Sequence, residues 1–393
     1  MNHSYFTHLE CTECHRSFSK KDIQTYCPDC SAPLAARYNL SLGLDKSVLW
    51  ARPKTMWRYH EVLPVEDPAH IVSLGEGFTP LLPMNNLGKQ WGLPHLFVKD
   101  ESGNPTASFK ARGLSMALSK AKEYGVTKVA LPTAGNAGSA LSAYAAKANM
   151  EAHVFMPIAT PSVFQMDCAF FGAKVRLIPG SIRDCGKAMA AENTHREWFD
   201  VSTLKEPYRV EGKKTMGYEI AEQCNWQLPD VLIYPAGGGT GLIGIWKAFE
   251  EMKTLGWITH IPTRMVCVQV TGCSPIADAF DKGLTTGLPV ENPDETIANG
   301  LRVPAPFGDR WMLRVLNQSR GRTIRINDAE MREGVQEVAR AEGLFLAPEG
   351  AATWMALRKL LEEGWILPTE KIVLINTGSA YKYIENLEYV PVP

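Results

Sequence analysis

The chain has 393 residues, and its 41 Lys and Arg against 42 Asp and Glu give a formal net charge of −1 at neutral pH. This length suits two or three domains with a large buried core, and the balanced charge argues against a general electrostatic attraction to nucleic acid or to an anionic membrane. No apolar run reaches the roughly 20 residues that cross a bilayer, and the first residues do not resemble a secretion signal. We therefore expect a cytoplasmic protein whose partner is a small molecule.

Four cysteines near the N-terminus form two Cys-x-x-Cys pairs, Cys11 with Cys14 and Cys27 with Cys30, and twelve residues separate the pairs. Four thiolates at this spacing can close a tetrahedron around zinc, which would stabilise a segment too short to fold on a core of its own. The pattern predicts a zinc ribbon over residues 1–36 with a structural metal, because four sulfur ligands leave no open position. The alternative is a site that has lost its metal, or thiols that are merely reducible pairs.

After about residue 95, short β-branched runs alternate with longer amphipathic segments. This alternation predicts an α/β fold in which mostly parallel sheets are flanked by helices. Residues 37–95 are rich in Pro, Trp and Gly without clear periodicity, and indicate an irregular lead-in. The predicted strands are 96–99, 128–132, 152–156, 174–178, 231–235, 264–270 and 371–376, and the clearest predicted helices are 138–149, 211–225 and 327–343.

Parallel sheets bind ligands beyond the carboxyl ends of their strands, which here are the loops after residues 99, 132, 235 and 376. The third of these loops reads PAGGGTGLIG, and Thr240 begins the helix that follows it. Successive glycines bring backbone amides close to an anion, and a helix N-terminus favours a phosphate. The loop has neither the dinucleotide pattern nor a Walker lysine, so a single phosphate fits it best. A strand-to-helix turn without any ligand remains the alternative.

One lysine, Lys110, lies in the stretch GNPTASFKARG, where the loop after the first of these strands meets a helix. On its own, such a lysine would be an ordinary surface residue. Lysine, however, is the residue that forms a Schiff base with an aldehyde, and pyridoxal phosphate (PLP) combines an aldehyde with one phosphate monoester. The lysine and the glycine loop together therefore predict a PLP site.

The stretch NPTASFKARG resembles the lysine motif of the tryptophan synthase β family, the fold type II PLP enzymes, which commonly read Asn-Pro-Thr-Gly-Ser-Phe-Lys. The resemblance covers nearly everything after residue 73. The Cys-rich head and the LGEG lead-in most resemble the threonine synthase branch of the family. The other similar segments, in the family's order, are SLGEGFTPLLP, LFVKDES, TAGNAGSALSAYAAKA, EPYRVEGKKTMGYEIAEQ, EGLFLAPEGAAT and NTGSAYKY.

The resemblance implies a role for each matching residue. Lys110 would carry the cofactor as a Schiff base and then move protons to and from the substrate carbons. Asn136 would bond the ring oxygen, while its helix N-terminus, with Thr133 and Ser139 nearby, would receive the substrate carboxylate. Thr377 would face the pyridine nitrogen. The cofactor-binding set implied in this way is Phe109, Lys110, Asn136, Gly237, Gly238, Gly239, Thr240, Gly241 and Thr377.

The resemblance also implies an architecture and a reaction. A small mobile lobe, residues 114–208, would face a large PLP-binding lobe built from 37–113 and 209–393, and the chain could form a homodimer. The implied activity is that of a PLP-dependent carbon–oxygen lyase. In the threonine synthase branch, O-phosphohomoserine and water give threonine and phosphate, so the substrate would be a small amino acid and the site must hold a second phosphate.

On the substrate side, the chain departs from the threonine synthase branch. The lysine is followed by Ala111 where Asp is usual, and Glu206 replaces an Asn beside the expected phosphate site, where Lys205 and Lys213 could compensate. The loop that commonly reads STGNTS is TAGNAG in this chain, so hydroxyl side chains are missing at Ala134, Ala137 and Gly138.

These departures leave other functions open. A serine or threonine dehydratase, or a β-replacement enzyme, could use the same scaffold, and a non-catalytic cofactor-binding protein is a third possibility that the intact lysine disfavours. Phosphate release from O-phosphohomoserine would support the synthase, whereas ammonia release from serine or threonine would support the dehydratase.

Overall fold

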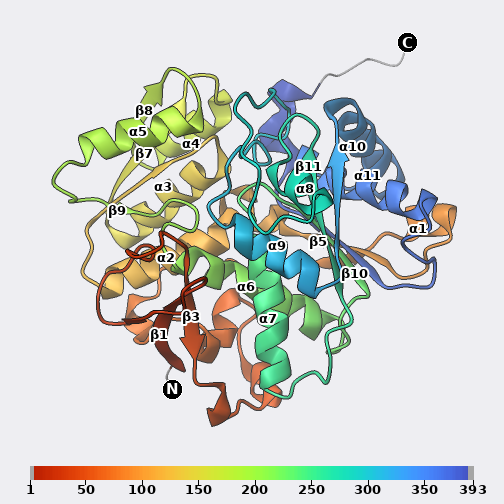
Figure 1. Ribbon diagram of the computed structural model, residues 1–393, viewed down its shortest axis with the longest axis horizontal. Coiled ribbons are helices and arrows are strands. Elements are labelled where there is room, and N and C mark those ends of the chain that lie inside the picture. The colour runs from red at the N-terminus through yellow and green to blue at the C-terminus, as the bar shows by residue number, and fades with distance from the viewer. Residues whose placement is uncertain (1–3, 388–393) are drawn as a thin grey trace.

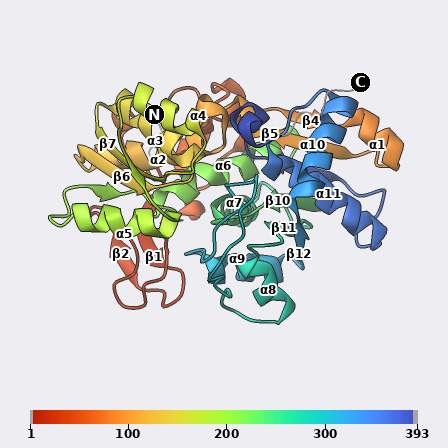
Figure 2. The same ribbon diagram turned by 90° about the horizontal axis from the view of Figure 1, so that it is seen from above.

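The structure is a computed structural model that describes residues 4–387. It contains a small N-terminal sheet and two larger α/β layers (Figure 1). Seen from above, the four-stranded sheet and its helices lie at one end, the six-stranded sheet lies at the other, and two central helices, α6 (Tyr208–Gln223) and α7 (Thr240–Thr254), lie between them (Figure 2). This arrangement confirms the predicted α/β fold of parallel sheets flanked by helices.

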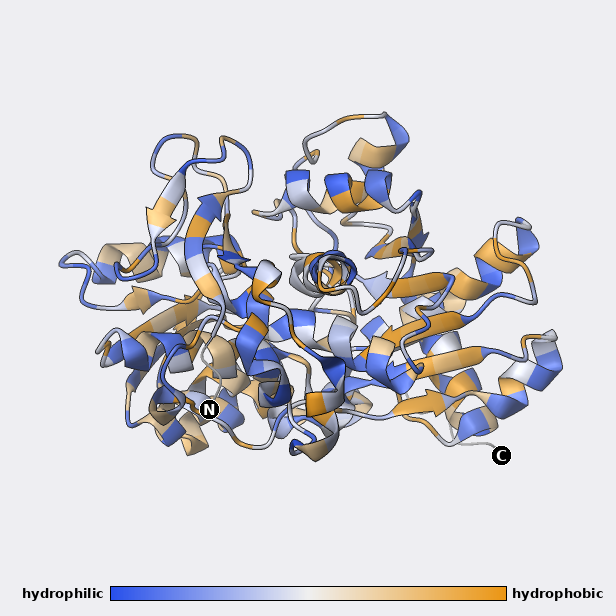
Figure 3. Ribbon diagram, turned by 90° about the horizontal axis from the view of Figure 1, so that it is seen from below, coloured by the Kyte–Doolittle hydropathy of each residue, from blue (hydrophilic) through white to orange (hydrophobic). Residues whose placement is uncertain are grey.

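The larger sheet has the order β12-β11-β10-β13-β5-β4 and is parallel except for β4. Its strands are mostly apolar (Figure 3), as expected for a sheet that is buried on both faces. In the central strand, Leu232 and Tyr234 face the helices α6 and α7, whereas Val231 and Ile233 pack on the opposite side. The strands are β4 Leu81–Pro83, β5 Leu96–Asp100, β10 Val231–Pro235, β11 Arg264–Val270, β12 Arg322–Ile326 and β13 Ile372–Asn376. The other helices of this layer are α1 Asn85–Trp91, α8 Pro275–Asp281, α9 Asp309–Gln318, α10 Asp328–Glu342 and α11 Pro348–Glu362.

The smaller parallel sheet has the order β8-β7-β6-β9. Alternate residues of β7 face opposite layers: Val154 and Met156 pack toward α2 and α3, and Phe155 packs toward α5. The elements of this layer are α2 Lys110–Glu123, β6 Lys128–Pro132, α3 Asn136–Ala148, β7 Glu151–Pro157, α4 Ser162–Phe170, β8 Lys174–Ile178, α5 Ile182–Glu192 and β9 Phe199–Asp200.

The N-terminal segment forms an antiparallel sheet of order β2-β1-β3, with β1 Phe6–Cys11, β2 Ser17–Ser19 and β3 Leu34–Tyr38. Residues 40–70, part of the expected irregular lead-in, form short 3-10 helices. The first Cys-x-x-Cys turn contacts α9: Arg314 lies 3.3 Å from Glu13 and donates to the carbonyl of Thr12 at 3.1 Å. The N-terminal sheet is therefore joined to the helix that packs beside the glycine loop.

A buried ionic network fixes α2 against β5 and α6. Arg112 pairs with Glu101 at 2.6 Å and with Glu219 at 2.5 Å, and Lys99 pairs with Glu219 at 2.8 Å. None of these four side chains is exposed. Burial raises the pKa of Glu219, but the charges of Arg112 and Lys99 outweigh it and hold that pKa at about 2. The carboxylate is therefore ionised at neutral pH, and the network sets the position of the helix that begins at Lys110.

Candidate cofactor and metal sites

Lys110 is the first residue of α2, and the loop that precedes it is joined to the loop after β13. Phe109 donates its backbone N–H to Thr377 at 3.0 Å, Ser379 donates to Ala107 at 3.1 Å, and Ser108 forms a β-bridge with Gly378. The structure thus brings the predicted lysine and the predicted threonine together at the carboxyl ends of neighbouring strands, where parallel sheets bind ligands.

The Lys110 ammonium is held without a counter-ion. Among the described residues, no hydrogen bond or ion pair reaches its Nζ, which lies 4.8 Å from the centre of the Phe109 ring. Burial and the positive charge of Arg209 lower the pKa of Lys110 to about 7, against the opposing charge of Glu349. A large fraction of the lysine is therefore a neutral, nucleophilic amine at physiological pH.

The glycine loop closes tightly between β10 and α7. Gly239 has φ +72°, and a Cβ there would overlap the Met312 sulfur of α9, while a Cβ at Gly237 would overlap the carbonyl oxygen of Gly300. Only glycine therefore fits both positions without displacing a neighbour. The loop delivers Thr240 as the first residue of α7, where free backbone amides and the helix dipole favour an anion.

A buried lysine from α6 lies directly at this helix start. Lys213 donates to the Thr240 hydroxyl at 2.8 Å and is completely buried, and its ammonium lies 4.8 Å from the same Phe109 ring that Lys110 contacts. Burial and the charges of Arg209 and Lys110 lower the pKa of Lys213 well below its usual value. An anion bound at the glycine loop would supply the missing negative charge.

Asn136 begins α3 and belongs to a hydrogen-bond chain that the sequence interpretation did not include. Its Nδ2 donates to the Tyr383 hydroxyl at 2.9 Å, and that hydroxyl donates to Glu349 at 2.9 Å. Glu349 also accepts the backbone N–H of Gly300 at 3.0 Å. Tyr383 and Glu349 lie in the quoted segments NTGSAYKY and EGLFLAPEGAAT, but nothing in those segments distinguished them from neighbouring polar residues.

Several buried polar atoms around Lys110 have no partner among residues 4–387, which is rare in a protein interior unless a ligand or water satisfies them. The predicted substrate contact Ser139 is one of them, while Thr133 accepts the backbone N–H of Gly135 at 3.1 Å within its own loop. These atoms, together with the lysine and the glycine loop, fit a polar cofactor and substrate. The partnerless atoms are Ser108 Oγ, Asn136 Oδ1, Ser139 Oγ, Arg209 Nε, Arg209 Nη2 and Glu349 Oε2.

A cationic group, Arg209, lies at the start of α6, four residues before Lys213. Arg209 is 1% exposed, and only its Nη1 is bonded, to the carbonyl of Val201 at 2.7 Å. Its unpaired Nε and Nη2 leave a fork that matches a phosphate or carboxylate. Sequence reasoning gave Arg209 no role; a charged residue inside the buried YRVEG stretch was the available signal.

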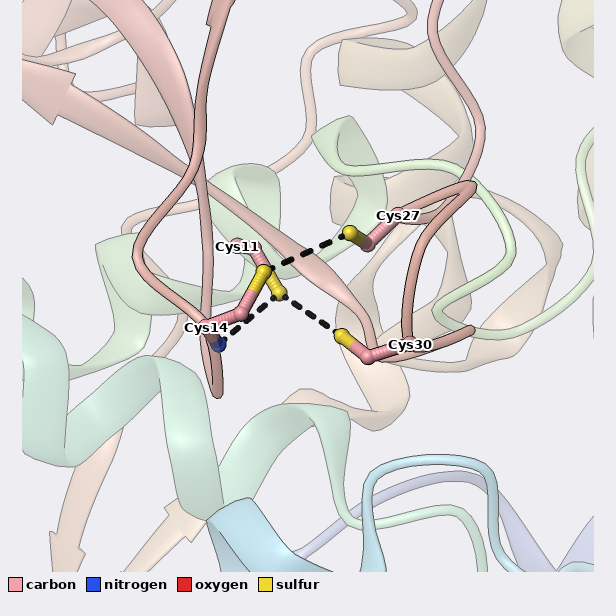
Figure 4. A group of neighbouring side chains, drawn as sticks. All are labelled: Cys11, Cys14, Cys27 and Cys30. Atoms are coloured by element: carbon pink, nitrogen blue, oxygen red, sulfur yellow. Dashed lines mark hydrogen bonds between the residues drawn. The ribbon is translucent and has the colours of Figure 1, made fainter.

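The four N-terminal cysteines converge as their spacing predicts (Figure 4). Their sulfur atoms all lie within 4.8 Å of one another, with Cys11 Sγ 3.4 Å from Cys30 Sγ and Cys14 Sγ 3.6 Å from Cys27 Sγ. No disulfide joins them. Four sulfur atoms at such distances can surround one metal ion, and thiolates are ligands that zinc prefers.

Comparisons with known proteins agree with this geometry. Residues 72–378 match the family described as pyridoxal-phosphate dependent enzyme. The threonine synthase of Methanocaldococcus jannaschii is 36% identical over 376 residues, 95% of this chain and 92% of that protein, and the threonine synthase of Methanosarcina acetivorans is 34% identical over 95% and 92%.

Solved structures share the fold at lower identity. Threonine deaminase isoform 2 of Solanum lycopersicum superposes with a TM-score of 0.66 at 19% identity, over 87% of this chain and 94% of that one. Diaminopropionate ammonia lyase of Escherichia coli gives a TM-score of 0.68 at 17% identity, over 80% and 88%. The site and fold define a PLP-dependent enzyme that acts on a small amino acid. The chain belongs to the pyridoxal-phosphate dependent enzyme family. The two relatives described above, which match 95% of its length, are threonine synthases.

Replacing Gly239 by Ala is expected to weaken PLP binding at least about tenfold, because a left-handed Ala costs about 1–2 kcal/mol and overpacking against Met312 costs about 1–3 kcal/mol more. Gly256, at the other end of α7, has the same φ of +72° but no atom within 4 Å of a Cβ, so Gly256→Ala isolates the backbone strain. Titration of the apo-protein with PLP, followed by absorbance, measures both affinities. Equal affinities for the two variants would contradict the role given to this loop.

Proposed function

We propose that this chain is a threonine synthase, which converts O-phosphohomoserine and water to threonine and phosphate. The relatives that cover 95% of the chain support the reaction. The observation that carries the choice of substrate is the buried fork of Arg209, whose Nε and Nη2 have no partner among the described residues. A second basic group, Lys213, contacts Thr240 after the glycine loop, and its pKa is lowered well below its usual value by burial and by the charges of Arg209 and Lys110. A phosphate bound nearby would favour the protonated form of Lys213, so the site can hold a substrate phosphate as well as the cofactor phosphate.

The chain's own residues would divide the work as follows. Bound PLP supplies an electron-withdrawing ring that stabilises negative charge on the substrate carbons. The Lys110 amine, with a pKa of about 7, anchors the cofactor and accepts and returns protons near neutral pH. Asn136, whose Nδ2 is oriented by Tyr383 and whose Oδ1 has no partner among the described residues, would contact the cofactor ring from the start of α3.

The leaving group is the part of the substrate that Arg209 would recognise. Charge builds up on the phosphate as its bond to the γ carbon breaks, and a buried guanidinium stabilises that charge more than water does. A dehydratase acting on serine or threonine releases hydroxide or water and needs no such fork. The buried basic groups therefore favour the phosphorylated substrate, although the hydroxyl-poor residues Ala134, Ala137 and Gly138 depart from typical synthases.

Steady-state assays of the PLP-loaded protein test this function. Release of inorganic phosphate from O-phosphohomoserine, with threonine as the other product, is the expected result. Formation of ammonia and a 2-oxo acid from serine or threonine, without phosphate release from O-phosphohomoserine, would instead establish a dehydratase and overturn the proposal.

Arg209→Met is expected to lower kcat/KM for O-phosphohomoserine by about 100-fold, since truncating one partner of a buried charge pair costs about 2–5 kcal/mol. The cofactor should still bind, because Arg209 is not part of the glycine loop. Arg183→Met, at an exposed position on α5, is the control for loss of a positive charge. An Arg209 variant that retains full kcat/KM would show that the substrate phosphate binds elsewhere.

The remaining parts of the proposal concern cofactor contacts and metal. The PLP contacts are those predicted from the resemblance, with Gly237, Gly238 and Gly239 at the phosphate and Thr377 at the ring nitrogen. Support comes from the backbone contacts that join the Thr377 loop to the Lys110 loop, and from Lys213, which contacts both Thr240 and the Phe109 ring. We further propose that the four converging cysteines hold one structural zinc ion.

We also propose the two-lobe architecture that the resemblance implies. A small lobe, 114–208, closes on the large lobe, 37–113 with 209–393, and thereby excludes water from the bound substrate. The two separate sheets and the position of Asn136 on the smaller one support this division. Among the described residues, no helix is both long enough and apolar enough to cross a membrane. We propose that the enzyme is cytoplasmic and that it can form a homodimer.

A further inference from the structure

Glu206 is a buried carboxyl group at the edge of the proposed phosphate subsite. Its side chain is completely buried, and it accepts the backbone N–H of Tyr208 at 2.7 Å and that of Arg209 at 3.1 Å. These bonds cap the start of α6, the helix that carries both Arg209 and Lys213. Any anion that binds the Arg209 fork would therefore come close to this carboxyl group.

The polar and charged groups around Glu206 come from four elements. Arg209 and Lys213 of α6 attract its ionised form, and the Tyr208 hydroxyl of the same helix is itself buried against Tyr124. Lys110 of α2 and Asp200 of β9 act on it through Lys213 and Arg209, respectively. Thr240 of α7 contributes a neutral hydroxyl that Lys213 contacts. One buried carboxyl group thus lies near one buried guanidinium, Arg209, and one buried amine, Lys213, whose pKa is lowered.

Burial favours the protonated form of the Glu206 carboxyl group. It raises the pKa of Glu206 to about 7, in spite of the opposing charges of Arg209 and Lys213 and the two backbone N–H donors. The carboxyl group is therefore close to its titration point at physiological pH. A dianion placed on the Arg209 fork would repel the carboxylate form in a region that water does not screen, and would favour the neutral acid.

We propose that Glu206 is an exchangeable counter-charge: above neutral pH it is ionised while the phosphate subsite is empty, and it takes up one proton from solvent when a phosphate-type dianion binds Arg209. The inference rests on the proposed function, since it assigns the subsite to the substrate's phosphate. Glu206 is a specificity and positioning residue, because it acts through the charge of the subsite without contacting the reacting carbons. An amino acid without a phosphate gains nothing from the proton, so the device favours phosphorylated substrates below the pKa of Glu206.

The consequence is a pH dependence of anion affinity with a defined sign. Below about pH 7 Glu206 is already protonated, so the dissociation constant does not change with pH. Above that pH the carboxyl group must bind a proton together with the anion, and the dissociation constant rises by about tenfold per pH unit.

Sulfate is the probe that isolates this linkage, because it remains a dianion over the whole pH range and cannot enter turnover. Calorimetric titration of the PLP-loaded protein with sulfate, in two buffers of different ionisation enthalpy, gives both the dissociation constant and the number of protons taken up. Between pH 7 and 9 we expect about a 50-fold loss of affinity and, at pH 8.5, uptake of close to one proton per sulfate bound.

Two variants decide the assignment. Glu206→Gln retains an acceptor for the backbone N–H groups but cannot titrate, so it should bind sulfate with little pH dependence, more tightly than the parent at pH 9, and without proton uptake. Asp200→Asn removes the other carboxylate that faces Arg209 and should keep the parental pH dependence. Unfolding temperature and the cofactor spectrum of each variant establish that the site is intact.

Three results would overturn the inference. The first is proton uptake that persists in Glu206→Gln, which would assign the proton to another group such as Lys213. The second is sulfate binding to the parent without proton uptake. The third is the absence of saturable sulfate binding. Because sulfate binding requires no turnover, the proposed function can fail separately. If the protein binds sulfate with proton uptake but does not convert O-phosphohomoserine, the synthase assignment is wrong and the role of Glu206 is still supported.

Discussion

Lys110→Ala is expected to lower turnover by more than about 10⁴-fold, because the amine both anchors the cofactor and transfers protons, and proton transfer alone contributes about 10²–10⁴-fold. The visible absorption of the lysine-bound cofactor should disappear at the same time. The fold should not suffer: the Lys110 ammonium has no hydrogen bond among the described residues, so its removal relieves an unpaired buried charge. The unfolding temperature of the apo-protein should therefore stay equal or rise.

The matched control is Lys122→Ala, at an exposed position on the same helix, where the ammonium only contacts the carbonyl of Ala69 at 3.2 Å. This variant should keep parental turnover and cofactor absorption. If Lys110→Ala kept the absorption of a lysine-bound cofactor, another lysine would be the anchor, and Lys213 would be the first to test because its ammonium lies near the same Phe109 ring.

Cys11→Ser combined with Cys14→Ser is expected to abolish metal binding and to unfold the N-terminal sheet. Structural zinc supplies about 10–16 kcal/mol of apparent binding free energy in zinc-finger peptides, whereas a three-stranded sheet of this size has little core of its own. Metal content measured by mass spectrometry should fall from one zinc per chain to near zero. Hydrogen exchange should show lost protection over residues 6–38.

The effect on catalysis should be smaller than the effect on stability. The first cysteine turn contacts α9 through Glu13 and Arg314, and α9 supports the glycine loop through Met312, so cofactor affinity should fall modestly. Cys224→Ser, a partly exposed thiol remote from the cluster, is the control. A parental protein that is purified without stoichiometric metal, yet has a fully protected N-terminal sheet, would contradict the zinc proposal.

The inner strands β6, β10 and β11 were predictable because most of their residues are apolar and buried, and the exposed edge strand β8 was predictable from the apolar residues in KVRLI. Predicted ranges 128–132, 174–178, 231–235 and 264–270 match β6, β8, β10 and β11 residue for residue. The prediction missed β12, an edge strand whose RTIRI sequence has only two aliphatic residues alongside two arginines and a threonine. β4 is three residues long and ends in Pro83, and β9 has two residues, so neither carries a periodic pattern.

The helix α6 shows why part of the site could not be predicted from the sequence. Its sequence, YRVEGKKTMGYEIAEQ, reads as an amphipathic surface helix, yet 14 of its 16 residues are buried. The charges are tolerated because they pair with other elements, as Lys214 does with Glu251 at 2.9 Å. Pairings between distant segments are invisible in one sequence, so the buried cation Arg209 and the acid Glu206 received no definite role. Lys110 and the glycine loop, by contrast, were recognisable because their chemistry lies within a short stretch.

The central claim, that Lys110 carries the cofactor, is tested most directly by trapping the link. Reduction of the PLP-loaded protein with sodium borohydride, followed by proteolysis and mass spectrometry, locates the modified residue. A single pyridoxyl group is expected, on the peptide that contains Lys110. A pyridoxyl group on any other lysine, or none on a protein that has been supplied with PLP, would contradict the claim.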